Sequence, residues 1–189
     1  MKAVMISVSP TICEKVASGD CTILVRKTRP KIDIPFKCYI YETKSYDTLF
    51  GKGKPKKLCV GGGKVIGEFV CDVIYGVFGF LPYGADYIHH LMLPYILEQT
   101  CLQDYEIDEY LGAKDGYGWH ISDLVIYDEP RELSEFEHPC PKRAQIIGDC
   151  RVCKYLGFGR SYRGMNCKCE FTRPPQSWQY VEEKESDNG

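Results

Sequence analysis

The first part of the chain alternates short apolar runs with turn residues, a pattern that predicts strands separated by one helix. The apolar runs at residues 2–8 and 21–25 are rich in β-branched side chains, which favours strands. Pro10 suits the first turn of a helix, where its missing N–H is not needed, so residues 11–17 are predicted to be helical. Pro30 ends the second strand region. The sequence therefore predicts a strand, a helix and a second strand.

The rest of the chain continues this pattern with more strands than helices. A tyrosine-rich insertion interrupts it at residues 75–97, for which only a partly helical segment at 87–92 is predicted. The stretch 51–63 is rich in glycine and lysine and is predicted to be a loop. Further strands are predicted at 36–41, 65–74, 119–127 and 178–181, and a short helix at about 102–111 with Gly112 as its C-cap.

Length and composition fit one compact unit with an appendage. The chain has 189 residues, 44% of them hydrophobic, which is enough to form a core in a single domain. It has no apolar stretch of membrane-spanning length and no recognisable secretory signal. We therefore expect a cytoplasmic protein with no membrane partner. In that setting the eleven cysteines are expected to be reduced thiols or metal ligands.

Charge is distributed unevenly along the chain. The net charge is −2, yet residues 26–64 contain eleven Lys and Arg against three acidic residues. Four of these cations, Arg26, Lys27, Arg29 and Lys31, follow the second predicted strand closely. A basic segment beside an acidic remainder suits a partner that is anionic and touches one side. The alternative is a solvated basic strand end, and for the lysine-rich loop at 52–57 a soluble hairpin.

Cysteine spacing near the C-terminus is typical of a zinc site. Cys150, Cys153, Cys167 and Cys169 form a Cys-x-x-Cys pair and a Cys-x-Cys pair separated by thirteen residues. Two close thiolate pairs can complete a tetrahedron around Zn²⁺, and four thiolates leave no open position, so the metal would be structural. Cys140 or His138 could substitute for one ligand. A redox pair, an iron–sulfur cluster and uncoordinated thiols are the alternatives.

Several segments resemble the ASCH domain, a member of the PUA-like superfamily. The helix followed by Ser18 and Gly19, then Thr22 and Arg26, is similar to the ASCH signature. The resemblance extends, in the order found in ASCH proteins of bacterial and prophage genomes, through the segments VRKTRPK, PFKCYIYETK, GKVIGEFVCD, YGWHISDLVIYDEPRELSEF and RPPQSWQYVEE.

The resemblance implies an α+β fold, a PUA-like mixed β-barrel with short helices and a small cysteine-rich, zinc-knuckle-like insertion. On this basis residues 1–136 are expected to form the barrel and residues 137–170 the insertion. Residues 171–183 would supply the closing strand. Residues 184–189 are expected to be a disordered tail.

The resemblance also implies an RNA-related role, which agrees with the basic segment. We expect RNA or a nucleotide-containing ligand to bind beside the signature strand, with Arg26 and Arg29 making bidentate contacts. Trp119 is a candidate surface for base stacking, with burial in the core as the alternative. The remaining candidate contacts are Thr22, as a hydrogen-bonding group, and Lys27, Lys31 and Lys64, as sources of electrostatic attraction.

Two other classes of function remain open. ASCH-like amidohydrolases use a lysine, a threonine and a glutamate, but Cys21 and Leu24 stand at the first two positions here, so we expect no catalytic residues of that kind. Glu68 could supply the carboxylate alone. Nucleoside hydrolysis or RNA cleavage would then depend on Cys21, for which a buried apolar role is the alternative. The third class is a protein-interaction module that uses the cysteine segment and the tyrosine-rich insertion.

Overall fold

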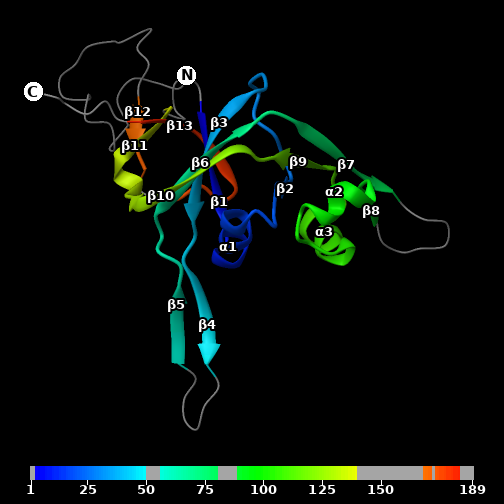
Figure 1. The fold of residues 1–189 in the computed structure, drawn as a ribbon, viewed down its shortest axis with the longest axis horizontal. Coiled ribbons are helices and arrows are strands. Elements are labelled where there is room, and N and C mark those ends of the chain that lie inside the picture. Colours follow the sequence, from blue (N-terminus) through cyan, green and yellow to red (C-terminus); the bar gives the residue numbers. More distant parts are fainter. Residues whose placement is uncertain (1–2, 50–55, 81–88, 140–167, 172, 184–189) are drawn as a thin grey trace, which may run out of the picture.

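A computed structural model describes residues 3–49, 56–80, 89–139, 168–171 and 173–183. Within these residues the chain is α+β and consists mostly of strands with few helices, which confirms the predicted class. None of the helices in the described ranges has the length and apolar character needed to cross a membrane. The strands form two larger sheets and one separate hairpin (Figure 1).

The larger sheet has seven strands in the order β10-β6-β3-β1-β13-β11-β12. At its centre the first and last strands are neighbours. β1 pairs antiparallel with β13 on one side and parallel with β3 on the other. Buried and partly buried residues alternate along β6, with the period of two that a half-buried strand requires. The strands are β1 (Ala3–Val8), β3 (Phe36–Glu42), β6 (Val65–Cys71), β10 (Ser122–Arg131), β11 (Phe136–Pro139), β12 (Lys168–Glu170) and β13 (Trp178–Glu183).

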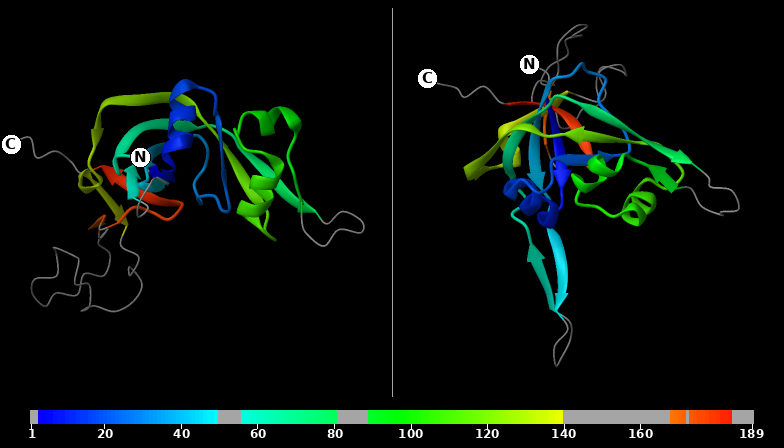
Figure 2. Two further views of the ribbon diagram at one scale, coloured as in Figure 1. Left: turned by 90° about the horizontal axis from the view of Figure 1, so that it is seen from below. Right: turned by 45° about the vertical axis from the view of Figure 1, so that its right-hand side comes forward.

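The second sheet has four strands in the order β2-β9-β7-β8. Two short helices, α2 (Pro94–Glu98) and α3 (Asp104–Leu111), pack against it through a cluster that includes Ile23, Val25 and Val77. Figure 2 shows these helices at the end of the molecule opposite β11 and β12. The strands are β2 (Ile23–Arg26), β7 (Ile74–Phe80), β8 (His89–Leu91) and β9 (Gly116–His120).

Helix α1 (Pro10–Ser18) connects the two sheets and begins as the sequence predicts. Pro10 occupies the first turn, and the helix ends at Gly19, whose φ of 84° is a left-handed conformation that glycine adopts readily. Cys13 and Val16 are buried and join the main core, which also contains Trp119 and Phe36. The helix therefore fixes the direction in which the chain enters β2. A short 3₁₀ turn, η1 (Leu133–Glu135), precedes β11.

Four predicted segments differ from the structure. Residues 87–92, predicted as partly helical, contain the strand β8, because periodicity cannot separate short apolar runs in helices from those in strands. The predicted strand 65–74 is divided between β6 and β7, and the predicted strand 119–127 between β9 and β10. The predicted loop at 51–63 contains β5 (Lys56–Val60), which pairs with β4 (Ser45–Leu49) in a hairpin that extends from the body of the molecule (Figure 1).

Candidate functional site

Arg26 ends β2 and turns its guanidinium toward the end of β1. Its two terminal nitrogens donate hydrogen bonds to the carbonyl oxygens of Val25 (2.7 Å) and Ser7 (2.8 Å). The third nitrogen, Nε, is enclosed by the protein and has no partner among the described residues. A buried donor without an acceptor is costly, so this N–H is energetically unusual for a folded protein.

The charge on Arg26 also lacks a counter-ion among the described residues. Within the described ranges, no carboxylate forms an ion pair with this guanidinium. Burial lowers the pKa of Arg26, which shows that its charged form is poorly solvated. Arginine nevertheless stays protonated in proteins. An anion, or an acceptor-rich edge of a ligand, would compensate this charge.

Two further polar atoms without a partner among the described residues lie on segments that touch this region. They are Nε1 of Trp119 and Oγ of Ser177, both buried. The Ser7 amide donates to the Ser177 carbonyl at 2.8 Å, and the ring of Trp119 lies 5.9 Å from that of Trp178. The junction of β1, β2, β9 and the start of β13 therefore gathers polar groups that the described protein does not satisfy. We call Arg26, Ser7, Ser177 and Trp119 the Arg26 site.

The segment after Arg26 carries three exposed cations past this site. Lys27 lies over the ring of Tyr110 at 5.0 Å, and Arg29 over the ring of Tyr117 at 5.8 Å. The Lys31 amide donates to the Tyr180 hydroxyl at 2.7 Å, which attaches the segment to β13. In the described part of the chain, none of the three cations forms an ion pair with a carboxylate. Their charges are therefore free to attract an anion.

Of the remaining predicted contacts, Thr22 and Lys64 have partners of their own and Trp119 lies in the core. The Thr22 hydroxyl donates to the Gln99 side-chain oxygen at 2.9 Å, and the Lys64 ammonium pairs with Glu132 at 2.7 Å. Trp119 is fully buried and packs edge-on against Phe36. Its ring faces are covered, which places it in the core and leaves only its Nε1 as a polar contribution. Arg26, Lys27, Arg29 and Lys31 thus lie on one continuous segment with no carboxylate partner among the described residues, whereas Thr22 and Lys64 have other partners.

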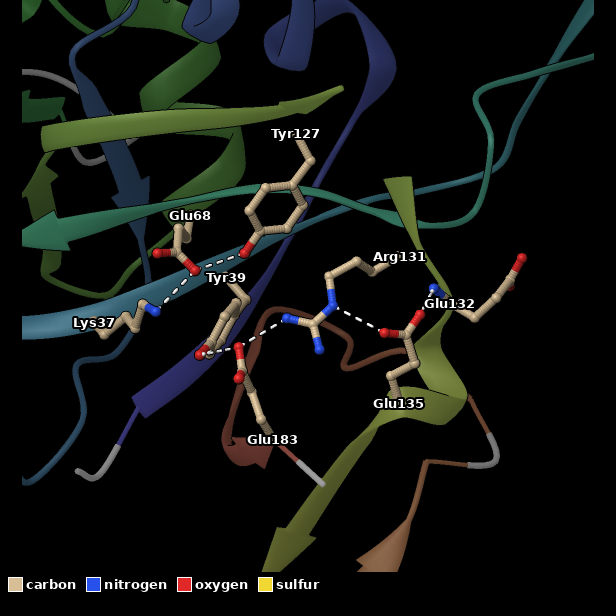
Figure 3. Close-up of polar contacts among 8 residues, drawn as sticks. All are labelled: Lys37, Tyr39, Glu68, Tyr127, Arg131, Glu132, Glu135 and Glu183. Carbon is tan, nitrogen blue, oxygen red and sulfur yellow. Dashed lines mark hydrogen bonds and ion pairs between the residues drawn. The ribbon is translucent and has the colours of Figure 1, made fainter. Parts of the chain in front are cut away.

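A second polar cluster joins β3, β6, β10 and β13 (Figure 3). Glu68 contacts the Lys37 ammonium at 2.8 Å, and Arg131 bridges Glu183 and Glu135 at 2.8 and 2.9 Å. Burial, together with hydrogen bonds to Glu183 and Glu68 respectively, raises the pKa of the hydroxyls of Tyr39 and Tyr127. Each of these carboxylates already has a cation beside it. The cluster therefore links strands, and because its charges are paired within the protein it is a weaker candidate for ligand binding than Arg26.

Sequence inspection did not identify Ser7 and Ser177 as candidates. They lie at opposite ends of the chain, and each is an ordinary polar residue in its local context. Only the pairing of β1 with β13 brings them together. No local signal could have identified them.

Most of the predicted zinc ligands lie outside the described residues. This holds for Cys140, Cys150, Cys153 and Cys167, whereas Cys169 lies on β12. In the ladder between β11 and β12, Cys169 is the direct partner of His138. No group of three or more metal-ligating side chains occurs among the residues that the structure describes.

Comparison with known proteins gives limited similarity. No family model matches the chain, and no curated protein matches it. Solved structures of the ASCH protein from Zymomonas mobilis are similar: one shares 18% identity over 69% of this chain and 73% of its own, with a TM-score of 0.44. A variant of that protein with one tyrosine replaced by phenylalanine shares 17% identity over 70% and 77%, with a TM-score of 0.45. Another variant, with one serine replaced by alanine, shares 15% identity over 97% and 89%, with a TM-score of 0.48.

Proposed function

We propose that the chain binds RNA, or a ligand that contains a nucleotide, at the Arg26 site. The observation that carries this proposal is the buried Nε of Arg26, a charged donor with neither an acceptor nor a counter-ion in the described structure. A guanidinium suits planar recognition of phosphate or of a base edge. The indole N–H of Trp119 and the Ser177 hydroxyl, on segments that touch this region, also lack partners among the described residues.

The cations that follow Arg26 support a phosphate-bearing ligand. Lys27, Arg29 and Lys31 extend from the site along one exposed segment, and two of them are steadied by tyrosine rings. Charges arranged in this way can follow a sugar-phosphate backbone, while Arg26 receives one enclosed group. The sequence resemblance to the ASCH domain agrees with this role.

The proposed architecture follows the same resemblance. The two larger sheets would form a PUA-like mixed barrel from residues 1–136, closed by residues 171–183. The pairing of β13 with β1 supports this arrangement, since it returns the C-terminal strand to the N-terminal one. Residues 137–170 would be inserted between β11 and the closing segment.

Fluorescence anisotropy with labelled single-stranded RNA, matched DNA and duplex RNA over a salt series tests the proposed function. We expect RNA to bind more tightly than DNA, and the affinity to fall steeply with salt. The double variant Arg29→Ala and Lys31→Ala should bind about ten-fold more weakly and reduce the salt slope by about two, one per lost phosphate contact.

The matched control removes two lysines of β5, Lys56→Ala and Lys57→Ala, on the hairpin that extends from the body of the molecule (Figure 1). It changes net charge equally, so it should retain affinity and slope within about two-fold. Equal weakening in both double variants would show that only general charge matters and would contradict a localised site.

A protein-interaction role is the second candidate. Phe78, Tyr95 and Tyr105 expose 64%, 58% and 67% of their surfaces on β7, α2 and α3. Exposed aromatic side chains are frequent at protein interfaces. Absence of nucleic-acid binding at low salt would favour this candidate. An enzymatic role has less support, because burial raises the pKa of the Cys21 thiol to about 11 and leaves little thiolate at neutral pH.

We also propose that Cys150, Cys153, Cys167 and Cys169 bind structural Zn²⁺. The spacing of the two pairs supports this set. His138, the alternative ligand, is the partner of Cys169 in the ladder of β11 and β12. The metal would supply folding free energy to a segment poor in aliphatic residues, and no catalytic step is assigned to it.

Zinc removal should therefore lower thermal stability without abolishing binding to RNA. Protein purified without added metal should contain about one zinc per chain by elemental analysis. Chelation should lower the unfolding midpoint of the cysteine segment, while the double variant Cys150→Ser and Cys153→Ser should lose the metal. Metal-free protein with unchanged unfolding in the presence of chelator would contradict the zinc site.

A further inference from the structure

Cys21 and Cys101 lie side by side, although eighty positions separate them in the sequence. The Cys21 thiol donates to the carbonyl of Thr100 at 3.5 Å, and the Cys101 thiol donates to the carbonyl of Asp20 at 3.2 Å. Each thiol thus contacts the residue that directly precedes the other cysteine. The nearby Cys101 side chain also raises the pKa of the Cys21 thiol.

Backbone contacts hold the two segments together. The amides of Thr22 and Ile23 both donate to the Gln99 carbonyl, at 3.0 and 3.1 Å. Cys101 has a φ of 54°, in the left-handed region that residues with a Cβ seldom adopt. The surrounding structure therefore holds both cysteines next to each other in the folded protein.

The two thiols differ in exposure, which gives them different chemical roles. Cys101 is partly exposed, whereas Cys21 is 1% exposed. The Lys15 ammonium donates to the Cys101 carbonyl at 3.3 Å, so a positive charge lies beside the pair. Burial raises the pKa of Cys21 to about 11, which makes Cys21 the slower nucleophile at neutral pH. Cys101 is thus the thiol that a dissolved oxidant reaches first.

We propose that Cys21 and Cys101 form a reversible disulfide when the protein meets a peroxide. The Cys101 thiolate attacks one peroxide oxygen, the O–O bond breaks, and the departing hydroxide takes up a proton as water, which leaves a sulfenic acid. The Cys21 sulfur then attacks the Cys101 sulfur, the S–O bond breaks, and the released hydroxide takes the Cys21 proton. Two thiols give up two electrons to one peroxide, and two waters form.

The disulfide would join the turn before β2 to the connection between α2 and α3. It would close a loop of about eighty residues, which restricts the unfolded chain strongly. We expect the oxidised protein to unfold at a midpoint roughly 5–10 °C higher than the reduced protein. Because β2 carries Arg26 at its far end, the bond would also fix the strand that positions the candidate site.

Peptide mapping after hydrogen peroxide treatment and differential alkylation of the full chain tests this proposal. We expect a cross-linked peptide containing Cys21 and Cys101, reversed by dithiothreitol. Its formation should accelerate above neutral pH, as Cys21 ionises. In Cys21→Ala the oxidation should stop at a Cys101 sulfenic acid that dimedone traps. In Cys101→Ser, Cys21 should stay reduced.

A matched pair in the same protein provides the control. Cys38 and Cys71 lie on neighbouring strands β3 and β6 and are both fully buried, so no oxidant reaches either of them. They should be recovered as alkylated thiols after unfolding. Reduced Cys101 in native protein at peroxide doses that oxidise a free cysteine standard, or Cys101 linked to a different cysteine, would overturn the proposal. Both results are measured on the native protein, so neither depends on whether a variant folds.

Discussion

Replacing Arg26 with methionine is expected to reduce affinity for single-stranded RNA by at least 100-fold. The substitution removes the Nε donor, whose hydrogen bond to an enclosed group is worth about 1.5–3 kcal/mol because the donor is charged, and the lost charge adds to this. Methionine has a similar length and no charge, so the apolar part of the side chain is preserved. Anisotropy at one fixed salt concentration measures the change.

The same substitution should shift the thermal unfolding midpoint by no more than about 3 °C. Methionine relieves a buried charge that has no counter-ion among the described residues, and this gain opposes the loss of the hydrogen bonds to Val25 and Ser7. A large loss of affinity with little change in stability is the expected signature of a ligand-binding residue. A loss of stability as large as that of a core truncation would show that Arg26 stabilises the fold and would contradict a role in ligand binding.

A conservative variant separates charge from geometry. Arg26→Lys keeps the positive charge but has no planar pair of donors, so we expect it to bind with intermediate affinity, about ten-fold weaker than the native chain. Affinity equal to the native protein in Arg26→Met would contradict the proposed site. In that event the exposed cations Lys27, Arg29 and Lys31 would have to account for binding without an enclosed contact.

The sequence predicted those parts of the fold that depend on local pattern. The strand at residues 2–8, the helix begun by Pro10 and the helix that ends before Gly112 all occur within a few residues of their expected bounds. Each is specified by neighbours in sequence: a β-branched run, a proline at the first turn, and a glycine after the last apolar residue. Their positions required no knowledge of tertiary contacts.

The candidate site was only half predictable, because it depends on pairing between distant segments. The run from Arg26 to Lys31 was identified by charge, which is a local property. Its neighbours Ser7 and Ser177 come together through the ladder of β1 and β13. Lys64 was included on charge alone, but tertiary structure gives it Glu132 as a partner. Local charge shows which side chains are cationic and cannot show which are already neutralised.

Truncation of Trp119 to alanine is expected to have the largest effect on stability. Its fully buried ring packs against Phe36 at 5.7 Å and Trp178 at 5.9 Å between centroids. Removing such a ring lowers the free energy of unfolding by about 3–5 kcal/mol. For a chain of this size the thermal midpoint should fall by roughly 10 °C or more. Differential scanning calorimetry measures the change.

Trp178 provides the matched control for this substitution. It is partly exposed, and its Nε1 donates to the Thr28 hydroxyl at 2.9 Å, so its indole is already satisfied. We expect Trp178→Ala to cost less than half as much as Trp119→Ala. Equal costs would contradict the placement of Trp119 at the centre of the core.

Trp119→Phe separates the ring from its unpartnered nitrogen. Phenylalanine preserves most of the packing against Phe36 and removes a buried donor that the described protein does not satisfy. We therefore expect less than half of the alanine variant's loss in stability. If the ligand accepts a hydrogen bond from this indole, RNA affinity should fall several-fold in Trp119→Phe despite the stable fold. Unchanged affinity would limit the ligand to Arg26 and Ser177, because a donor that makes no contact can be removed without loss of binding.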